Sequence, residues 1–292
     1  MKKTFLVTGA SGFLGAHLIQ RLLNDGYQVI GIKRKSSQLW RLQDVLNYEN
    51  LKLYDVDEVD RVFQSSAIDC VIHTVCSYGR NNESLVDIVK TNLLFGLEIF
   101  ELAKNNNVNC FFNTDTLLQK DLNNYSLSKK QFVEWIYKNH GYMQVFNMRI
   151  EHMYGVMDDS NKFITWIVEQ LKNNVSVIDL TSGIQKRDFV YVTDVVNAYL
   201  TVFDHRETLE GFQNFDVATG TQICVKDFVS EIFYLEKKRN PDLSTVLNFG
   251  AKAYRKGEQM EVQEDVTPLK KLGWKPEHDY RYNIELLLEE NR

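Results

Sequence analysis

A tyrosine and a lysine lie four residues apart in the stretch "NYSLSKK", as Tyr125 and Lys129. Residues at positions i and i+4 share one face of a helix, so both side chains can reach the same bound molecule. Thr114 and Asp115 precede this pair, directly after the apolar run "CFFN". A phenol beside an ammonium group is a source of a proton, because the positive charge favours the phenolate. Taken alone, the spacing favours an ordinary helix with a packed tyrosine and an exposed lysine.

The first apolar run of the chain ends in a glycine-rich loop. The run "TFLV" leads into "TGASGFLG", followed by the amphipathic stretch "FLGAHLIQRLL". Glycines between a strand and a helix let backbone N–H groups approach a pyrophosphate, which also interacts favourably with the helix N-terminus. The array therefore predicts a dinucleotide site in preference to a purely structural turn. The predicted contacts of this loop are Gly9, Ser11, Gly12, Phe13, Leu14 and Gly15.

The end of the second apolar run, "QVIGI", indicates which dinucleotide is bound. An Asp or Glu there would bond the ribose 2′-OH of NAD, but the chain has Lys33 and Arg34. Cations at this position suit the 2′-phosphate of NADP, so the sequence favours NADP (or NADPH) over NAD. The alternative is a solvated basic turn. Asp55 and Val56 follow the third run and are placed to flank the adenine, although Asp is common in any turn.

Short apolar runs alternate with helical patterns through the first half of the chain. Runs at 4–7, 28–32, 51–54, 70–74, 110–113 and 144–149 are typical of strands, and helices are expected near 13–25, 38–46, 58–66, 83–104 and 126–140. Near-continuous apolar strands between helices predict an α/β doubly wound parallel sheet, a Rossmann fold. Ligands bind at the carboxyl ends of such strands, where Thr114 lies.

After Gly155 this alternation loosens. Helices are expected near 162–173, 225–238 and 280–290, with a strand near 213–217. We therefore expect a dinucleotide-binding domain over 1–155 and a smaller substrate-binding lobe over 156–292, with 187–203 able to pack back on the first domain. The cleft between the two is the expected place for ligands.

Composition excludes several classes of protein. The chain has 292 residues, with 44% hydrophobic and 25% charged residues and a net charge of −5, which is ordinary for a globular protein and unfavourable for binding nucleic acid or an anionic membrane. No stretch approaches the roughly 20 apolar residues that span a bilayer. The six histidines lack metal-ligand spacing, so no metal site is expected. The four cysteines form no C-x-x-C pair and are expected to be buried free thiols in the cytoplasm.

Several motifs occur together in one order. The glycine array is followed by Asp55-Val56, "VIH" at 71–73, Asn92, Thr114, the Tyr125/Lys129 pair, "RDFVYVTDV" and "DVTPLKKLGWKP". This ordered set resembles the extended short-chain dehydrogenase/reductases, the sugar-nucleotide epimerase/dehydratase family. Within that family, "FFNTD", "FNMRIEHMYG" and "NKFI" are most similar to the CDP-abequose and CDP-paratose synthase type of 4-ketoreductase. The resemblance implies NADPH-dependent reduction of the C4 keto group of a nucleotide-linked 6-deoxy or 3,6-dideoxy hexose for a surface polysaccharide.

The resemblance also implies roles for the residues of the site. Tyr125 would be the general acid that protonates the alkoxide formed by hydride transfer. Lys129 would lower the pKa of Tyr125 and bind the nicotinamide ribose, and Thr114 would donate a hydrogen bond to the same substrate oxygen. Asn92 would support the active-site backbone, with an ordinary polar residue on a helix face as the alternative. Thr74 is the remaining predicted cofactor contact.

The resemblance places a nucleotide-diphosphate sugar on the second lobe. Arg187 and Arg255 match family arginines that contact the diphosphate, which suits the bidentate geometry of a guanidinium; a surface ion pair is the alternative for each. Lys162 and Phe163 lie where the family approaches the nucleotide. The full set of predicted substrate contacts is Tyr78, Asp115, His152, Lys162, Phe163, Arg187 and Arg255.

The residues after Thr114 bear on the choice of reaction. The 4,6-dehydratases of the family carry Asp-Glu there, whereas this chain has Asp115-Thr116, and a hydroxyl cannot replace a carboxylate base. A 4-epimerase with tightly held NAD and a non-catalytic NAD(P)-binding sensor stay open as alternatives. Only 11 positions separate Thr114 from Tyr125, fewer than the family usually has, so a wall beside the sugar is shortened. The family also implies a homodimer through helices near 83–104 and 126–140.

Overall fold

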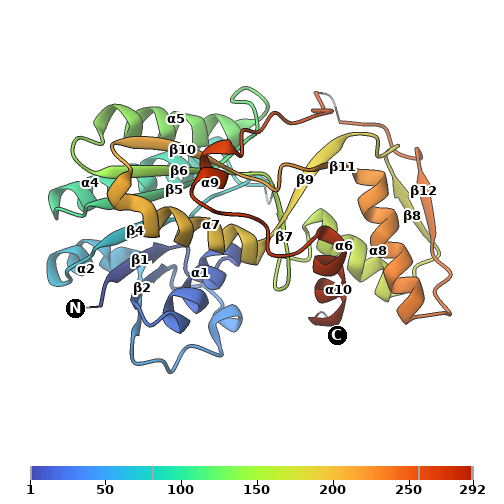
Figure 1. Ribbon diagram of the computed structural model, residues 1–292, viewed down its shortest axis with the longest axis horizontal. Helices are drawn as coiled ribbons and strands as arrows, with labels where there is room; N and C mark the ends of the chain where they lie inside the picture. Colours follow the sequence, from blue (N-terminus) through green and yellow to red (C-terminus); the bar gives the residue numbers. More distant parts are fainter. Residues whose placement is uncertain (1, 81, 256, 291–292) are drawn as a thin grey trace.

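The computed structural model describes residues 2–80, 82–255 and 257–290, which form a larger and a smaller lobe (Figure 1). The larger lobe is built on a seven-stranded sheet with the order β10-β6-β5-β4-β1-β2-β3. All six pairings in it are parallel. The strands are β1 (Thr4–Thr8), β2 (Gln28–Lys33), β3 (Leu51–Asp55), β4 (Cys70–His73), β5 (Cys110–Thr116), β6 (Gln144–Ile150) and β10 (Phe212–Val217).

Helices cover both faces of this sheet, as its two-sided apolar strands require. α1 (Phe13–Asn24) and α7 (Val192–His205) pack together on one face, where the ring centroids of Phe5 and Phe203 are 4.6 Å apart. α2 (Val59–Ser65), α4 (Phe95–Asn105) and α5 (Asn124–Asn139) cover the other face, around a buried cluster that includes Phe100 and Phe132 (Figure 1). The doubly wound α/β fold predicted from the sequence is confirmed.

Segments from the second half of the chain return to the larger lobe. β10 pairs with β6 at the edge of the main sheet, and α7 belongs to the buried cluster beneath it. α9 (Thr267–Lys271) packs against β10, and its Leu269 joins the same cluster together with Trp274. The division at 155/156 remains a proposal, and residues 192–217 lie physically with the first part of the chain.

The smaller lobe holds the rest of the described chain (Figure 1). β7 (His152–Tyr154), β9 (Lys186–Tyr191) and β11 (Gln222–Cys224) form one short sheet, and β8 (Val177–Leu180) pairs with β12 (Val246–Phe249). α6 (Phe163–Lys172), α8 (Val225–Arg239) and α10 (Tyr280–Glu290) pack around a separate buried cluster. In that cluster Phe189 of β9 stacks on Phe228 of α8 with 3.8 Å between ring centroids.

Two helices of the larger lobe differ from the expectation. The helix expected near 38–46 is wrong: the segment forms only a 3₁₀ turn at Trp40–Leu42 followed by further turns. Leu42 and Val45 are nevertheless buried, so the apolar spacing that predicted a helix anchors a loop instead. The helix expected over 83–104 is divided into α3 (Leu85–Val89) and α4 by a π-helical segment, Lys90–Leu94. Such segments often occur at functional sites.

Candidate functional site

The loop between β1 and α1 is a tight turn that requires glycine. Gly9 has a φ of +69°, and a Cβ added to Gly15 would lie 2.2 Å from the Gly9 carbonyl oxygen. The Thr74 hydroxyl, just after β4, donates to the Thr8 carbonyl at 2.7 Å and borders the same loop. Neither glycine can carry a side chain without moving the loop, and a tight glycine turn at a helix N-terminus is the kind of backbone that binds a diphosphate. The loop also contains Ser11, Gly12, Phe13 and the buried Leu14.

The predicted 2′-phosphate residues lie in two different environments. Lys33 forms an ion pair with Asp55 on the neighbouring strand, with 2.5 Å between Nζ and Oδ1. Arg34 is exposed, and its guanidinium has no partner among the residues that the structure describes. Val56 follows Asp55 and is 36% exposed. Of the two predicted cations, only Arg34 is therefore free to meet a phosphate without breaking an existing pair.

Tyr125 and Lys129 lie one turn apart near the start of α5. The helix begins at this place because the Asn123 side chain accepts a hydrogen bond from the Ser126 N–H at 2.9 Å, as an N-cap does. Tyr125 is half-buried and Lys129 is 1% exposed. The expected shared helix face is thus turned toward the interior of the larger lobe.

Asn92 ties this turn of α5 to the segment after β4. Its side chain is fully buried in the π-helical segment. The amide oxygen accepts the Ser77 N–H at 2.6 Å, and Nδ2 donates to the Ser77 carbonyl at 2.8 Å and to the Ser128 hydroxyl at 2.9 Å. Ser128 in turn donates to the Tyr125 carbonyl at 2.9 Å. Asn92 therefore acts on the backbone around the pair, as a supporting residue would.

Burial sets the protonation of this cluster. It raises the pKa of the Tyr125 phenol well above its usual range and lowers the pKa of the Lys129 ammonium. This is opposite to the expectation that Lys129 lowers the pKa of Tyr125, because loss of water disfavours both charged forms. His73 of β4 lies nearby, and burial, with a smaller effect of Lys129, lowers its pKa to about 3. Burial therefore disfavours the charged form of both Tyr125 and Lys129.

Tyr78 and Lys162 join the site from two different lobes. The Tyr78 ring lies 4.9 Å from the Tyr125 ring, and the Lys162 ammonium lies 3.5 Å from the centre of the Tyr78 ring. The pKa of the Tyr78 phenol is raised, most strongly by the neighbouring Cys76 thiol and next by burial. Cys76 is half-buried rather than buried, and the sequence did not place it at the site. No sequence motif marks Cys76 as a site residue, because it reaches the site only through its position after β4.

Thr114, Asp115 and Thr116 end β5 but face different neighbours. The Thr114 hydroxyl shares a hydrogen bond with the Tyr199 hydroxyl of α7 at 2.7 Å. Asp115 is 3% exposed and forms an ion pair with Lys130 at 2.8 Å. The Thr116 hydroxyl accepts the Leu118 N–H at 3.2 Å. Predicted contact of Asp115 with substrate remains a prediction, and it would have to compete with Lys130.

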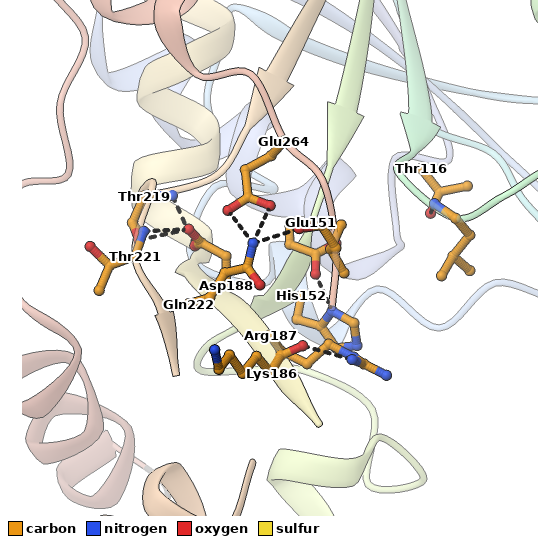
Figure 2. Close-up of polar contacts among 12 residues, drawn as sticks. Thr116, Glu151, His152, Lys186, Arg187, Asp188, Thr219, Thr221, Gln222 and Glu264 are labelled. Carbon is orange, nitrogen blue, oxygen red and sulfur yellow. Dashed lines mark hydrogen bonds and ion pairs between the residues drawn. The ribbon is translucent and has the colours of Figure 1, made fainter. Parts of the chain in front are cut away.

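The predicted diphosphate side lies on β7 and β9 of the smaller lobe (Figure 2). His152 is held by the buried Glu151, with 3.0 Å between Nδ1 and Oε1. Arg187 is 7% exposed and forms an ion pair with Glu258 at 2.5 Å. Arg255 lies exposed three residues before Glu258, and Phe163 is 42% exposed at the start of α6.

Asp188 is a supporting residue that the sequence analysis missed. It is fully buried beside Arg187, and its carboxylate accepts the N–H groups of Thr219, Gly220 and Thr221 at 2.7–2.9 Å (Figure 2). These bonds fix β9 to the turn before β11. The Asp of the "RDFVYV" motif therefore has a structural role in holding this turn, and sequence spacing does not reveal that role.

Comparison with known proteins identifies the family. The model of the NAD dependent epimerase/dehydratase family matches residues 5–218, most of the chain. The chain belongs to this family. It is 35% identical to CDP-abequose synthase of Salmonella typhimurium over 99% of this chain and 98% of that protein, and 26% identical to dTDP-D-glucose 4,6-dehydratase of Mus musculus over 98% and 88%. The solved UDP-glucose 4-epimerase of Thermotoga maritima shares the fold, with a TM-score of 0.83 at 23% identity over 99% of this chain and 98% of that one.

Family membership makes this chain an oxidoreductase-type enzyme of nucleotide-sugar metabolism with an NAD(P) site. The tight glycine loop at the start of α1 fits such a cofactor. Within the described ranges, no group of His, Cys, Asp and Glu side chains could hold a metal ion, and no helix is both long and apolar enough to cross a membrane.

Proposed function

We propose that the enzyme reduces the C4 keto group of a nucleotide-linked 6-deoxy or 3,6-dideoxy hexose, with NADPH supplying the hydride, to make a surface-polysaccharide sugar. The observation that carries this proposal is the 35% identity to a CDP-abequose synthase across nearly the whole of both chains. The Tyr125/Lys129 pair supports it, because both side chains lie together in a desolvated turn of α5.

Tyr125 would hold the proton that the C4 oxygen needs. Its raised pKa keeps the phenol protonated at neutral pH, which is the form that a general acid requires. Lys129 is buried, and its ammonium donates no hydrogen bond to another described side chain or carbonyl. Its N–H groups are therefore available to hydroxyls of a bound cofactor. The Thr114 hydroxyl would exchange its bond to Tyr199 for one to the substrate oxygen.

Reduction is favoured over dehydration by the residues that follow Thr114. Elimination of water needs a base beside the acid. Thr116 has no carboxylate and its hydroxyl accepts a backbone N–H, while the Asp115 carboxylate is already paired with Lys130. Neither side chain is poised to remove a proton from the sugar.

The proposed preference for NADPH rests on Arg34. Its exposed guanidinium suits a 2′-phosphate, and no acid follows the second strand to bind the 2′-OH of NAD. The Lys33–Asp55 ion pair favours a second candidate, a 4-epimerase with tightly held NAD, because it withdraws one of the two cations. Purified enzyme that carries bound NAD and loses no NADPH during turnover would support this second candidate.

The diphosphate of the nucleotide sugar would bind between Arg187 and Arg255. Arg187 is buried and paired with Glu258, so we propose that the diphosphate replaces this carboxylate. Arg255 precedes Glu258 in the same segment and is exposed. His152, Lys162 and Phe163 would complete the nucleotide side of the cleft.

We also propose a homodimer and a cytoplasmic location. Large apolar side chains are exposed on the helices that the family would pair: Leu85 is 63% exposed, Val86 58% and Trp135 54%. Pairing of α3 and α5 across a two-fold axis would cover them.

A substrate panel tests the proposed reaction. The enzyme would be incubated with NADPH and with CDP-, UDP-, dTDP- and GDP-linked 4-keto-6-deoxy sugars, and absorbance of NADPH would be followed. We expect stoichiometric loss of NADPH with one of them. Turnover of a nucleotide sugar without any loss of NADPH would reject the reductase assignment.

A further inference from the structure

Arg41 joins the two lobes. It lies in the 3₁₀ turn of the larger lobe but is only 7% exposed. Its Nη1 donates to the Ser11 carbonyl of the glycine loop at 3.3 Å, its Nε donates to the Met157 carbonyl at 2.7 Å, and its Nη2 forms an ion pair with Asp159 at 2.7 Å. One guanidinium therefore connects the glycine loop to the loop 155–162 that leads into α6.

The backbone of Arg41 is held by the larger lobe, whereas the loop 155–162 that its side chain contacts is not tightly packed. The Gln20 side chain of α1 donates to the Arg41 carbonyl at 2.7 Å. A cavity of about 440 Å³, lined by residues that include Trp40, Asp158 and Ser160, lies against the loop. Met157 has a φ of +64°, a left-handed conformation that is strained for a non-glycine residue. The bonds to Arg41 therefore help to hold this loop in place.

The same loop continues to the reacting groups. The Lys162 N–H donates to the Asp159 carbonyl at 2.9 Å, and the Lys162 ammonium lies 3.5 Å from the Tyr78 ring centre. Tyr78 packs against Tyr125 at 4.9 Å. Contacts thus run without a gap from the glycine loop, through Arg41 and residues 157–162, to the predicted general acid.

We propose that Arg41 is a positioning residue that couples the dinucleotide site to the nucleotide-sugar site, so that occupation of either one strengthens binding at the other. Ser11 lies on the cofactor side of this contact, and Met157 and Asp159 lie on the substrate side. This inference rests on the proposed nucleotide-sugar site. Coupling between two ligands is reciprocal, so either ligand can serve as the probe.

The test is the affinity for NADPH with and without a nucleoside diphosphate. NADPH fluorescence titrations would be run with saturating CDP, UDP, dTDP or GDP. In the unmodified enzyme we expect one of these to tighten NADPH binding by about fivefold or more, and in the Arg41→Met variant by less than about twofold. Arg41→Lys and Asp159→Asn each keep part of the contact set, so both should show intermediate coupling.

Arg21→Met is the matched control. It removes the same charge from an arginine paired with Asp25 on the exposed side of α1, and it should keep full coupling. Thermal melting would check that each variant folds. If Arg41→Met does not fold, the Arg41→Lys and Asp159→Asn variants are used to measure the coupling instead. Full coupling in folded Arg41 variants, or none in the unmodified enzyme, would overturn the inference and leave the proposed function standing. If none of the four nucleotides binds, both fail.

Discussion

His73 makes stability depend on pH in a way that can be measured. The side chain is fully buried close to Lys129, its Nδ1 shares a hydrogen bond with the Thr8 hydroxyl at 2.9 Å, and burial lowers its pKa from 6.5 to about 3. Replacing His73 with Phe removes the titrating group and keeps aromatic packing against Phe111 and Phe132.

The sign and size of the effect follow from linkage. Below pH 6.5 the unfolded chain binds a proton at His73 while the folded chain does not, so the free energy of unfolding falls as the pH falls. With pKa values of 6.5 unfolded and about 3 folded, the loss between pH 8 and pH 5 is about 2 kcal/mol. Asp158 acts in the opposite direction, because burial raises its pKa to about 6 and acidification through pH 6 then favours the folded state. Asp158 is present in both the unmodified enzyme and the His73→Phe variant, so the difference between their pH dependences of stability comes from His73.

Urea unfolding at pH 8 and pH 5, followed by circular dichroism, measures this difference. The unmodified enzyme should lose about 2 kcal/mol more than His73→Phe between the two pH values. His73→Phe also loses the bond to Thr8. This loss lowers the stability of the variant equally at both pH values, so it does not affect the change in stability between them. His205→Gln, at an exposed histidine, should keep the original pH dependence. The same pH dependence in His73→Phe and the unmodified enzyme would refute a neutral buried imidazole.

Three further outcomes are expected. Tyr125→Phe should lower kcat by about 10²–10⁴-fold with NADPH affinity retained, since only the proton donor is lost; an unchanged rate in the NADPH absorbance assay would remove Tyr125 from the mechanism. Gly15→Ala should weaken NADPH binding at least about tenfold in fluorescence titrations, because its Cβ would meet the Gly9 carbonyl at 2.2 Å. Gly141→Ala is strained at a φ of +60° but has nothing within 4 Å of its Cβ, so it should bind NADPH normally. Leu85→Asp should convert the proposed dimer to a monomer in size-exclusion chromatography with light scattering, and a monomeric unmodified enzyme would contradict the dimer.

The large-scale order of the site could be predicted because it depends on local patterns. Continuous apolar runs located the strands of the main sheet, and the glycine array located the loop at the start of α1. The i, i+4 spacing placed Tyr125 and Lys129 on one helix face. Each of these features is specified within about 20 residues of sequence.

What could not be predicted depends on neighbours far apart in the chain. Lys33 meets Asp55 only because their strands pair in register. The pKa of Tyr125 rises rather than falls because burial is the largest influence on it, and the neighbouring Cys76 and Asp115 groups raise it further. Arg41 lies in a segment whose apolar spacing indicated a helix, and its partners Ser11 and Met157 are 30 and 116 positions away. No single-sequence pattern reports such contacts.

The fate of the transferred hydride shows whether this enzyme is a reductase. The enzyme would be incubated with NADPH deuterated at the transferring position and with the nucleotide-linked 4-keto sugar that it consumes, and the product would be analysed by NMR and mass spectrometry. If NADPH reduces the C4 ketone as proposed, the product carries one deuterium at C4 of the sugar and one NADP forms for each sugar reduced. A product without deuterium at C4, formed while the deuterated NADPH stays intact, would contradict it.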